Sequence, residues 1–473
     1  MELPRMEEYS NIIISSNINN VSSQIMKKVI LLFNLIFIGF LNTFSQTWNE
    51  RIAQAMNDSD WFKLDSLYKE SPKDSISGFI EVYSRCLIGN RLNRTDISIP
   101  AFSELFNNYS QDLDMSNLIS SAIMYAMDLS RIGQNEAATN LLSSIIDAVS
   151  PHLEKSQLKH LEQFRSLYKG LSNFKPYSLT FEDDCPGTIP FRIVSAGPKD
   201  KDGKHMILEN SAINGIPTDF IFDTGAGVNV ITDSLARKYN LLPLEAELDA
   251  KGIGNETGRF VIANELKLGN VIVNDVPFLV LSMESNNAEA DRYLMKMDLI
   301  VGSELMLQLK DLTLDFHNNQ ITVPSIAPDR SNEKPNMCFS STMNLLTSAV
   351  IENSPLLIRI DTGDVSFGTL DYGFFKMNEN WIKQTSKKET LRFAGLGGTT
   401  KTKCYQTPNL KLYLGDNSVI LPQIAVISNK NSQIKNNLGL KALMLFGKVR
   451  FNLVDFVLST EPRANFIYND DNL

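Results

Sequence analysis

The first clear pattern of apolar positions along the chain has the spacing of helices. Apolar residues recur three and four positions apart in two runs, 115–127 and 137–149, which places them on one face of a helix. Gly133 lies between the runs and Pro151 follows the second, so we expect an antiparallel helix pair. Similar short amphipathic segments come earlier in the chain. The pattern predicts an all-α domain of helical hairpins over residues 46–175.

The helix pairs of this domain resemble helical repeats of the tetratricopeptide type. No clean period of about 34 residues with its signature residues is visible, however. A helical-repeat domain could hold a protein partner, and the alternative is a packing or spacer domain. The sequence alone leaves both interpretations open.

After residue 176 the helical spacing gives way to short strands. β-branched and aromatic runs are separated by Gly, Asn and Asp, which predicts an all-β region. Asn214-Gly215 and Gly269-Asn270 are typical of tight hairpin turns. A polar segment that contains proline separates two such regions. We therefore expect a first β unit, a linker and a second β unit over the ranges 176–325, 326–336 and 337–473.

One apolar run, Val29 to Leu41, stands near the N-terminus, with Lys27 and Lys28 before it and small polar residues after it. This order is typical of a secretory signal peptide, and the run is shorter than the roughly 20 residues of a membrane span. We expect residues 1–45 to be an export signal, with the signal peptide itself at about 26–45 and Met26 as an alternative start. The protein would then be periplasmic or secreted, with no stable membrane span. The alternative is an uncleaved N-terminal anchor.

Composition and charge exclude several function classes. The 473 residues include 45 Lys and Arg against 54 Asp and Glu, a net charge of −9. An acidic chain without basic runs makes nucleic acid an unexpected partner. The motifs GxSxG, HExxH and GxxxxGK[ST] are absent from the sequence, and neither a metal nor another cofactor is expected. Four widely spaced cysteines fit no CxxC motif, and they are either disulfide partners or small buried residues: Cys86, Cys185, Cys338 and Cys404.

The two β units repeat one series of features in the same order. Each has an apolar strand that leads into Asp-Thr-Gly, then a glycine turn about thirty residues later, then a strand that ends in Leu-Gly. Each then reaches two apolar residues and a glycine, Ile300-Val301-Gly302 and Leu445-Phe446-Gly447, before a closing strand. One Asp-Thr-Gly would arise by chance in roughly one chain in fifteen of this length. Two copies in matched settings indicate a duplication.

This duplicated pattern resembles the retropepsin-like aspartic proteases and, in one chain, the two-lobed pepsin-like architecture. The resemblance covers roughly residues 185–468. It implies an all-β acid-protease fold as a tandem two-lobe pseudo-dimer, preceded by the all-α domain. It also implies a catalytic pair, Asp223 and Asp361, with active-site loops supported by Thr224, Gly225, Thr362 and Gly363. It places substrate-binding flaps at the glycine turns, which are Gly252, Ile253, Gly254, Gly395, Leu396, Gly397 and Gly398.

The chemistry of two adjacent carboxyl groups agrees with this assignment. Two carboxylates a few ångström apart cannot both ionise cheaply, so they share a proton. The ionised member can take a proton from water while the protonated member donates to the scissile carbonyl oxygen. The predicted function is an exported aspartic endopeptidase that hydrolyses a peptide or protein substrate. The alternative is a non-catalytic peptide-binding or scaffold protein with a degenerate protease body.

Two residues of the second unit depart from the pattern of the first. Asp364 stands where the first unit has Ala226, and a third carboxyl group there would need a raised pKa or a partner of its own. Arg359 stands where the first unit has Ile221. Because of these departures, the alternative that Asp361 is a structural remnant of a lost site stays open.

Overall fold

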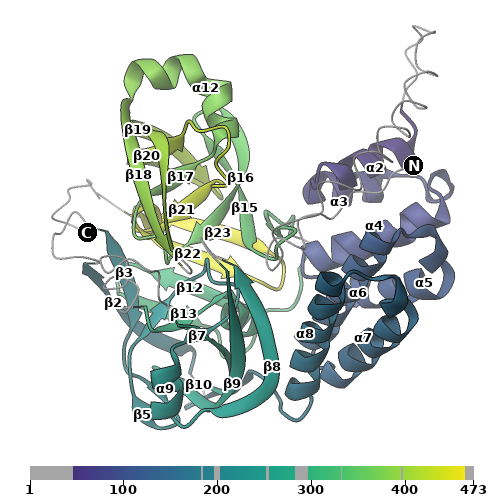
Figure 1. Cartoon of the computed structure of the whole chain (residues 1–473). Coiled ribbons are helices and arrows are strands. Elements are labelled where there is room, and N and C mark those ends of the chain that lie inside the picture. Colours follow the sequence, from purple (N-terminus) through teal and green to yellow (C-terminus); the bar gives the residue numbers. More distant parts are fainter. Residues whose placement is uncertain are drawn as a thin grey trace, which may run out of the picture.

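The chain forms a helical region followed by a larger β region (Figure 1). This computed structural model describes residues 46–182, 185–195, 203–251, 255–282, 297–331, 333–395 and 398–463. The predicted export signal, residues 1–45, lies outside the described residues. None of the described helices is both long enough and apolar enough to cross a membrane.

The helical region consists of successive helices that pack their apolar faces on one another. The pair predicted from the two apolar runs is present, and Gly133 turns the chain between them with φ of +79°. Asp114 caps the first of these helices by accepting a hydrogen bond from the amide of Asn117 at 2.8 Å. The helices are α2 (Trp48–Asn57), α3 (Trp61–Glu70), α4 (Gly78–Arg91), α5 (Thr95–Asn108), α6 (Met115–Arg131), α7 (Asn135–Val149) and α8 (Lys155–Leu171).

In the described part of the first half of the β region, strands alternate with the short helices α9 (Asp233–Lys238) and α11 (Ser303–Leu309). Asn214 and Gly215 both have positive φ, as a two-residue hairpin turn of type I′ requires. The strands are β1 (Ser178–Phe181), β2 (Gly187–Ser195), β3 (Lys204–Leu208), β4 (Ser211–Ile213), β5 (Ile216–Pro217), β6 (Phe220–Phe222), β7 (Val230–Ile231), β8 (Leu242–Lys251), β9 (Asn255–Leu268), β10 (Val271–Val280), β11 (Leu299–Val301), β12 (Asp311–Asp315) and β13 (Gln320–Val323).

The second half, drawn in green to yellow in Figure 1, has a similar composition of strands with helices α12 (Tyr372–Thr385) and α13 (Leu440–Leu443). Its strands are β14 (Met337–Phe339), β15 (Leu345–Ile351), β16 (Ser354–Asp361), β17 (Gly368–Leu370), β18 (Lys387–Gly395), β19 (Gly398–Leu414), β20 (Asn417–Ile427), β21 (Asn437–Gly439), β22 (Phe446–Asn452) and β23 (Val457–Pro462).

The two halves share one pattern of strand pairing. In the first half the order is β6-β11-β7-β10-β9, and in the second it is β16-β21-β17-β20-β19. The first two strands of each series pair in parallel, as do the third and fourth. In each half a long outer strand, β8 or β18, then pairs antiparallel with β9 or β19. The duplication read from the sequence is therefore matched by a repeated topology.

One detail of the predicted repeat is wrong. In the first half Phe222 pairs with Val301, so Gly302 follows beside Asp223, whereas in the second half Asp361 pairs with Gly439. The counterpart of Ile300-Val301-Gly302 is therefore the segment 437–439 and not 445–447, which enters β22. Segment 445–447 has two apolar residues before its glycine, whereas segment 437–439 begins with Asn437, so only the parallel register between strands identifies the true counterpart.

The closing strands of the two halves pair with each other. Strand β12 runs antiparallel to β22, and Thr313 lies opposite Arg450 at the centre of the pairing. Strands β13 and β23 flank them on either side. Through this junction the last two strands of the second half, β22 and β23, join the sheet of the first half, whereas β14 to β21 form a sheet of their own.

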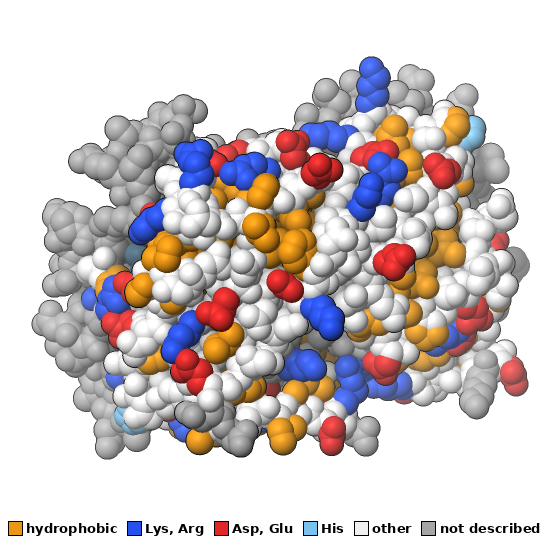
Figure 2. All heavy atoms as spheres, turned by 90° about the horizontal axis from the view of Figure 1, so that it is seen from below, with side chains coloured by type: hydrophobic (Ala, Val, Ile, Leu, Met, Phe, Trp, Pro, Cys, Tyr) orange, Lys and Arg blue, Asp and Glu red, His pale blue; other side chains and the backbone are white. Residues whose placement is uncertain are grey.

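The helical region packs against both halves. Helix α8 lies beside β8, where Lys159 Nζ and Asp249 Oδ2 are 2.6 Å apart (Figure 1). From α4, Arg91 Nη1 donates to the carbonyl oxygen of Ser340 in the second half at 2.8 Å. Cys338 packs into the core of the helices α2 to α5. The face seen from below in Figure 2 shows acidic, basic and hydrophobic side chains interspersed.

The cysteines are all free thiols. Three of them, Cys86, Cys338 and Cys404, are buried, whereas Cys185 is exposed. The sequence left two interpretations open, disulfide partners or small buried residues. The second describes three of the four cysteines.

Candidate functional site

The two Asp-Thr-Gly segments lie at the ends of equivalent central strands. Asp223 directly follows β6, whose three residues are all buried, and its amide donates to the carbonyl oxygen of Val301 at 3.0 Å. Asp361 is the last residue of β16. The buried residues of β6, and the buried Ile360 and Asp361 at the end of β16, fix the backbone just before each loop, so each aspartate leaves its sheet at a defined point.

Reciprocal hydrogen bonds join the two loops through their threonines. The Thr224 amide donates to Thr362 Oγ1 at 3.0 Å, and the Thr362 amide donates to Thr224 Oγ1 at 3.1 Å. Each hydroxyl in turn donates across the pair, from Thr224 to the carbonyl oxygen of Ile360 at 2.9 Å and from Thr362 to that of Phe222 at 2.7 Å. Both threonines are buried, so these bonds replace contacts with water and fix the loops relative to each other.

The glycines of the two loops allow the aspartates to approach. A Cβ atom on Gly225 would lie 2.4 Å from Asp361 Cγ, and one on Gly363 would lie 2.4 Å from Asp223 Cγ. Each carboxyl group thus fills the space above the glycine of the other loop. The two carboxyl groups therefore lie close together, and the charge of one acts on the other. The structure therefore brings together all six residues predicted for the loops.

Burial and mutual charge disfavour ionisation of both carboxyl groups. Burial, and then the charge of Asp361, raise the pKa of Asp223 to about 7. Backbone amides hold both carboxylates in similar positions. Asp223 Oδ1 accepts from Gly225 at 2.8 Å and from Ala226 at 3.1 Å, and Asp361 Oδ1 accepts from Asp364 at 3.0 Å. One proton shared by the pair near neutral pH is the expected state.

The two departures seen in the sequence belong to one polar network beside Asp361. Arg359 forms an ion pair with Asp361, and its Nε donates to Asn437 Oδ1 at 2.8 Å. Asn437 Nδ2 then donates to Asp364 Oδ2 at 2.7 Å, while Ser366 Oγ donates to Asp364 Oδ1 at 2.7 Å. Burial and the charge of Asp361 raise the pKa of Asp364. The third carboxyl group thus has partners of its own, as its position required.

Of the predicted flap residues, the structure describes Gly395 and Gly398. Gly395 pairs with Gly398 at the end of β18 and β19. The β8–β9 hairpin ends at the pair of Lys251 with Asn255. The residues at the tips themselves lie outside the described residues, and they are Gly252, Ile253, Gly254, Leu396 and Gly397. Their contact with a substrate stays a prediction.

A second polar chain, which the sequence did not indicate, supports the first loop. Asn229 Oδ1 accepts from the amide of Gly302 at 3.0 Å, and its Nδ2 donates to the hydroxyl oxygen of Tyr177 at 3.1 Å. Burial and then the charge of Glu304 raise the pKa of Tyr177, and burial raises the pKa of Glu304 to about 7. These residues come from three separate segments, so no spacing in the sequence could connect them. Only the position of Asn229, six residues after Asp223 in a polar loop, could have marked it.

Comparison with known proteins assigns part of this region. A family model described as aspartyl protease matches residues 210–303, which include the first Asp-Thr-Gly and the segment Ile300-Val301-Gly302. No curated protein matches the chain. Within the described residues, no three His, Cys, Asp or Glu side chains are grouped so that they could hold a metal ion. The chain thus contains an aspartic protease-like region that carries Asp223.

Proposed function

We propose that the protein is an exported aspartic endopeptidase whose single chain supplies both catalytic aspartates. The observation that carries this proposal is the reciprocal hydrogen bonding of Thr224 and Thr362, because it sets Asp223 and Asp361 against each other. The aspartyl protease match over residues 210–303 supports the chemical class. The repeated strand order supports two lobes, 176–325 and 337–473, that meet at the two loops.

The charges at the site give the two aspartates different roles. Arg359 forms an ion pair with Asp361, and the raised pKa of Asp223 favours the protonated form of Asp223 below about pH 7. Asp361 would then take a proton from a water molecule as the water oxygen attacks the scissile carbonyl carbon. Asp223 would donate its proton to the carbonyl oxygen. A tetrahedral diol with no net change in proton count results.

Collapse of the diol completes the reaction. Asp361, which now holds the proton from water, donates it to the amide nitrogen as the carbon–nitrogen bond breaks. Asp223 takes a proton back from a diol hydroxyl, which leaves a carboxylic acid and an amine. The pair returns to its starting state, so no covalent intermediate and no cofactor is needed.

The parts outside the loops have proposed roles of their own. An extended peptide would bind by strand-like backbone hydrogen bonds between the aspartates and the hairpin tips near Gly254 and Gly397. The helical domain, 46–175, would hold a protein partner or position the lobes. Export through the segment 26–45 would deliver the protein to the periplasm or the exterior, without a stable membrane span.

One observation favours a second candidate, a non-catalytic scaffold that binds peptides. Arg359 forms an ion pair with a carboxylate oxygen of Asp361, and Asp364 adds a half-buried carboxyl group next to it. A protease half that no longer needs a free carboxylate would tolerate both. Under this alternative the site binds a peptide without cleaving it.

Substitution of each aspartate separates the candidates. We expect Asp223→Asn and Asp361→Asn each to abolish cleavage of a mixed peptide library, while the exposed linker variant Asp329→Asn retains it. Full activity in Asp361→Asn would show that the first lobe pairs with a second chain instead. No cleavage by the unmodified protein at any pH from mildly acidic to neutral would favour the scaffold.

A further inference from the structure

The outer hairpins of the two halves differ in charge. From Lys387 to Tyr405 the β18–β19 hairpin has a single acidic residue, Glu389, and five basic ones, Lys387, Lys388, Arg392, Lys401 and Lys403. The corresponding β8–β9 hairpin has four acidic and two basic residues over 242–260. Since the whole chain has a net charge of −9, a basic hairpin is a local feature and does not follow from composition.

The strand register places like charges directly opposite each other on this hairpin. Arg392 pairs with Lys401. Thr390 pairs with Lys403, which lies two residues further along its strand and therefore on the same face as Lys401. These side chains are exposed, and among the described residues Arg392, Lys401 and Lys403 have no ion-pair partner. Like charges directly opposite on a sheet are destabilising. A bound anion would remove that repulsion.

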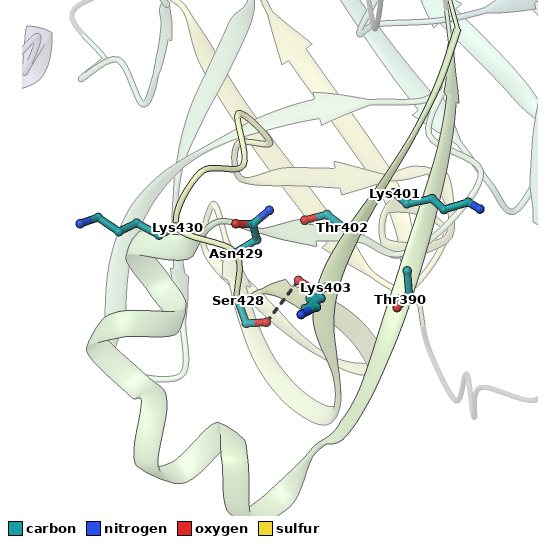
Figure 3. A pocket seen from close by; sticks show the side chains of 7 residues that line it. All are labelled: Thr390, Lys401, Thr402, Lys403, Ser428, Asn429 and Lys430. Atoms are coloured by element: carbon teal, nitrogen blue, oxygen red, sulfur yellow. Dashed lines mark hydrogen bonds between the residues drawn. The ribbon is translucent and has the colours of Figure 1, made fainter.

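A hollow of about 500 Å³ lies at this basic surface, between the hairpin and the segment that follows β20. Lys401, Lys403 and Lys430 line it (Figure 3). The hydroxyl of Thr402 is buried and, within the described part of the chain, lacks a hydrogen-bond partner, and its side chain points toward Asn429 across the hollow. We call the exposed residues Arg392, Lys401, Lys403 and Lys430 the basic face.

The basic face borders an open sheet edge. Strand β18 is the last strand of its sheet and pairs with β19 alone among the described strands. In the first half, helix α8 packs against the corresponding strand β8, and Lys159 pairs there with Asp249. The helices lie on the other side of the β region from β18 in Figure 1. The edge of β18 can therefore accept an added strand, whose side chains would meet lysines.

We propose that the basic face binds an acidic, extended segment of the protein substrate. Lys401 and Lys430 extend to opposite sides of the hollow, so the positive charge is spread along a line. Such a distribution fits several carboxylates along an extended chain better than one compact anion. Only the identity of the ligand as a substrate rests on the proposed function.

Binding is tested in the full-length Asp223→Asn protein, which would not cleave the probe. A fluorescent peptide rich in Asp and Glu should bind, and the same peptide with Asn and Gln in their place should not. We expect Lys401→Glu/Lys403→Glu to weaken binding by about tenfold or more, and added salt to do the same in the parent. Lys401→Gln/Lys403→Gln, which only removes charge, should weaken it less.

The control variant makes the same change in net charge at two lysines outside the basic face. Lys334 in the linker and Lys376 in α12 are both exposed, and Lys334→Glu/Lys376→Glu should leave peptide affinity within about twofold. Equal weakening by this control would overturn the proposal, because binding would then follow net charge alone. Tighter binding of single-stranded DNA or anionic-lipid vesicles than of the acidic peptide would also overturn it.

A kinetic comparison links the basic face to cleavage. In the unmodified protein, a cleavable substrate with an acidic extension should have a lower KM than one with an amide extension. In Lys401→Glu/Lys403→Glu this difference should disappear. Peptide binding without any cleavage would contradict the proposed function and leave the binding surface intact, whereas cleavage without a preference for the acidic extension would contradict the surface alone.

Discussion

Arg359 and Asp361 form an ion pair along strand β16, where the first half has the apolar Ile221. The partner of Arg359 on the neighbouring strand is Asn437, at the position where the first half has Ile300. An apolar cross-strand pair in one half is thus a polar pair in the other. The two aspartates therefore have unequal surroundings, although their backbone loops are alike.

The unequal surroundings predict how activity depends on pH. Asp223 must be protonated to donate to the carbonyl oxygen, and its pKa is raised to about 7 by burial and the charge of Asp361. Below this pH the proton is present, and above it the proton is lost. We therefore expect kcat/KM to fall about tenfold per pH unit above about pH 7. A profile measured on one peptide would contradict this if activity stayed constant up to pH 9.

Replacement of Arg359 by the residue of the first half should shift that profile. The positive charge of Arg359 lowers the pKa of Asp223, so Arg359→Ile should move the loss of activity to higher pH. We also expect kcat/KM at its maximum to fall by about tenfold, because the ionised carboxylate loses its cation. Arg359→Lys keeps the charge, and its profile should shift less. Identical pH profiles for all three proteins would show that Arg359 does not influence the protonation of Asp223.

The threonine hydrogen bonds predict a large loss of stability. Thr224→Val removes a hydroxyl that both accepts from Thr362 and donates to Ile360, and it leaves a buried amide and a carbonyl group unpaired. We expect a loss of about 2–4 kcal/mol in the free energy of unfolding, measured with urea. Thr224→Ser keeps the hydroxyl and should lose much less. The double variant with Thr362→Val should lose less than the sum, because the four bonds form one network.

Glu304 predicts a dependence of stability on pH. Burial raises its pKa from 4.5 to about 7 in the folded protein, so the folded state holds its proton more tightly than the unfolded state. Its contribution is therefore complete below about pH 4.5 and is lost as pH rises through about 7, by on the order of 3 kcal/mol. Asp223 contributes with the same sign, so the comparison must be made against Glu304→Gln. Urea unfolding at pH 5 and pH 8 should show a smaller difference in that variant than in the unmodified protein.

The sequence predicted the order of elements better than the contacts between them. Periodicity distinguished helices up to Leu171 from strands after Ser178, because each period reflects one face of one element. The hydrogen bond of Arg359 to Asn437 could not be predicted, because Asn437 is 78 residues away and is adjacent only through the register of parallel strands. The confusion of Gly439 with Gly447 has the same cause. The local pattern of a sequence does not specify which residues of two neighbouring strands lie opposite each other.

The last prediction concerns the glycines that let the aspartates meet. In Gly363→Ala the new Cβ would lie 2.4 Å from Asp223 Cγ, and no real Cβ tolerates that contact, so the carboxyl group must move. A displacement of about 1 Å at a reacting group can cost about a hundredfold in rate, and we expect kcat to fall by that order. Gly227→Ala is the matched control, because a Cβ there meets nothing within 4 Å and the residue is exposed in the loop that follows Asp223. Equal activity of the two variants would mean that the close approach of the loops is not what makes the site.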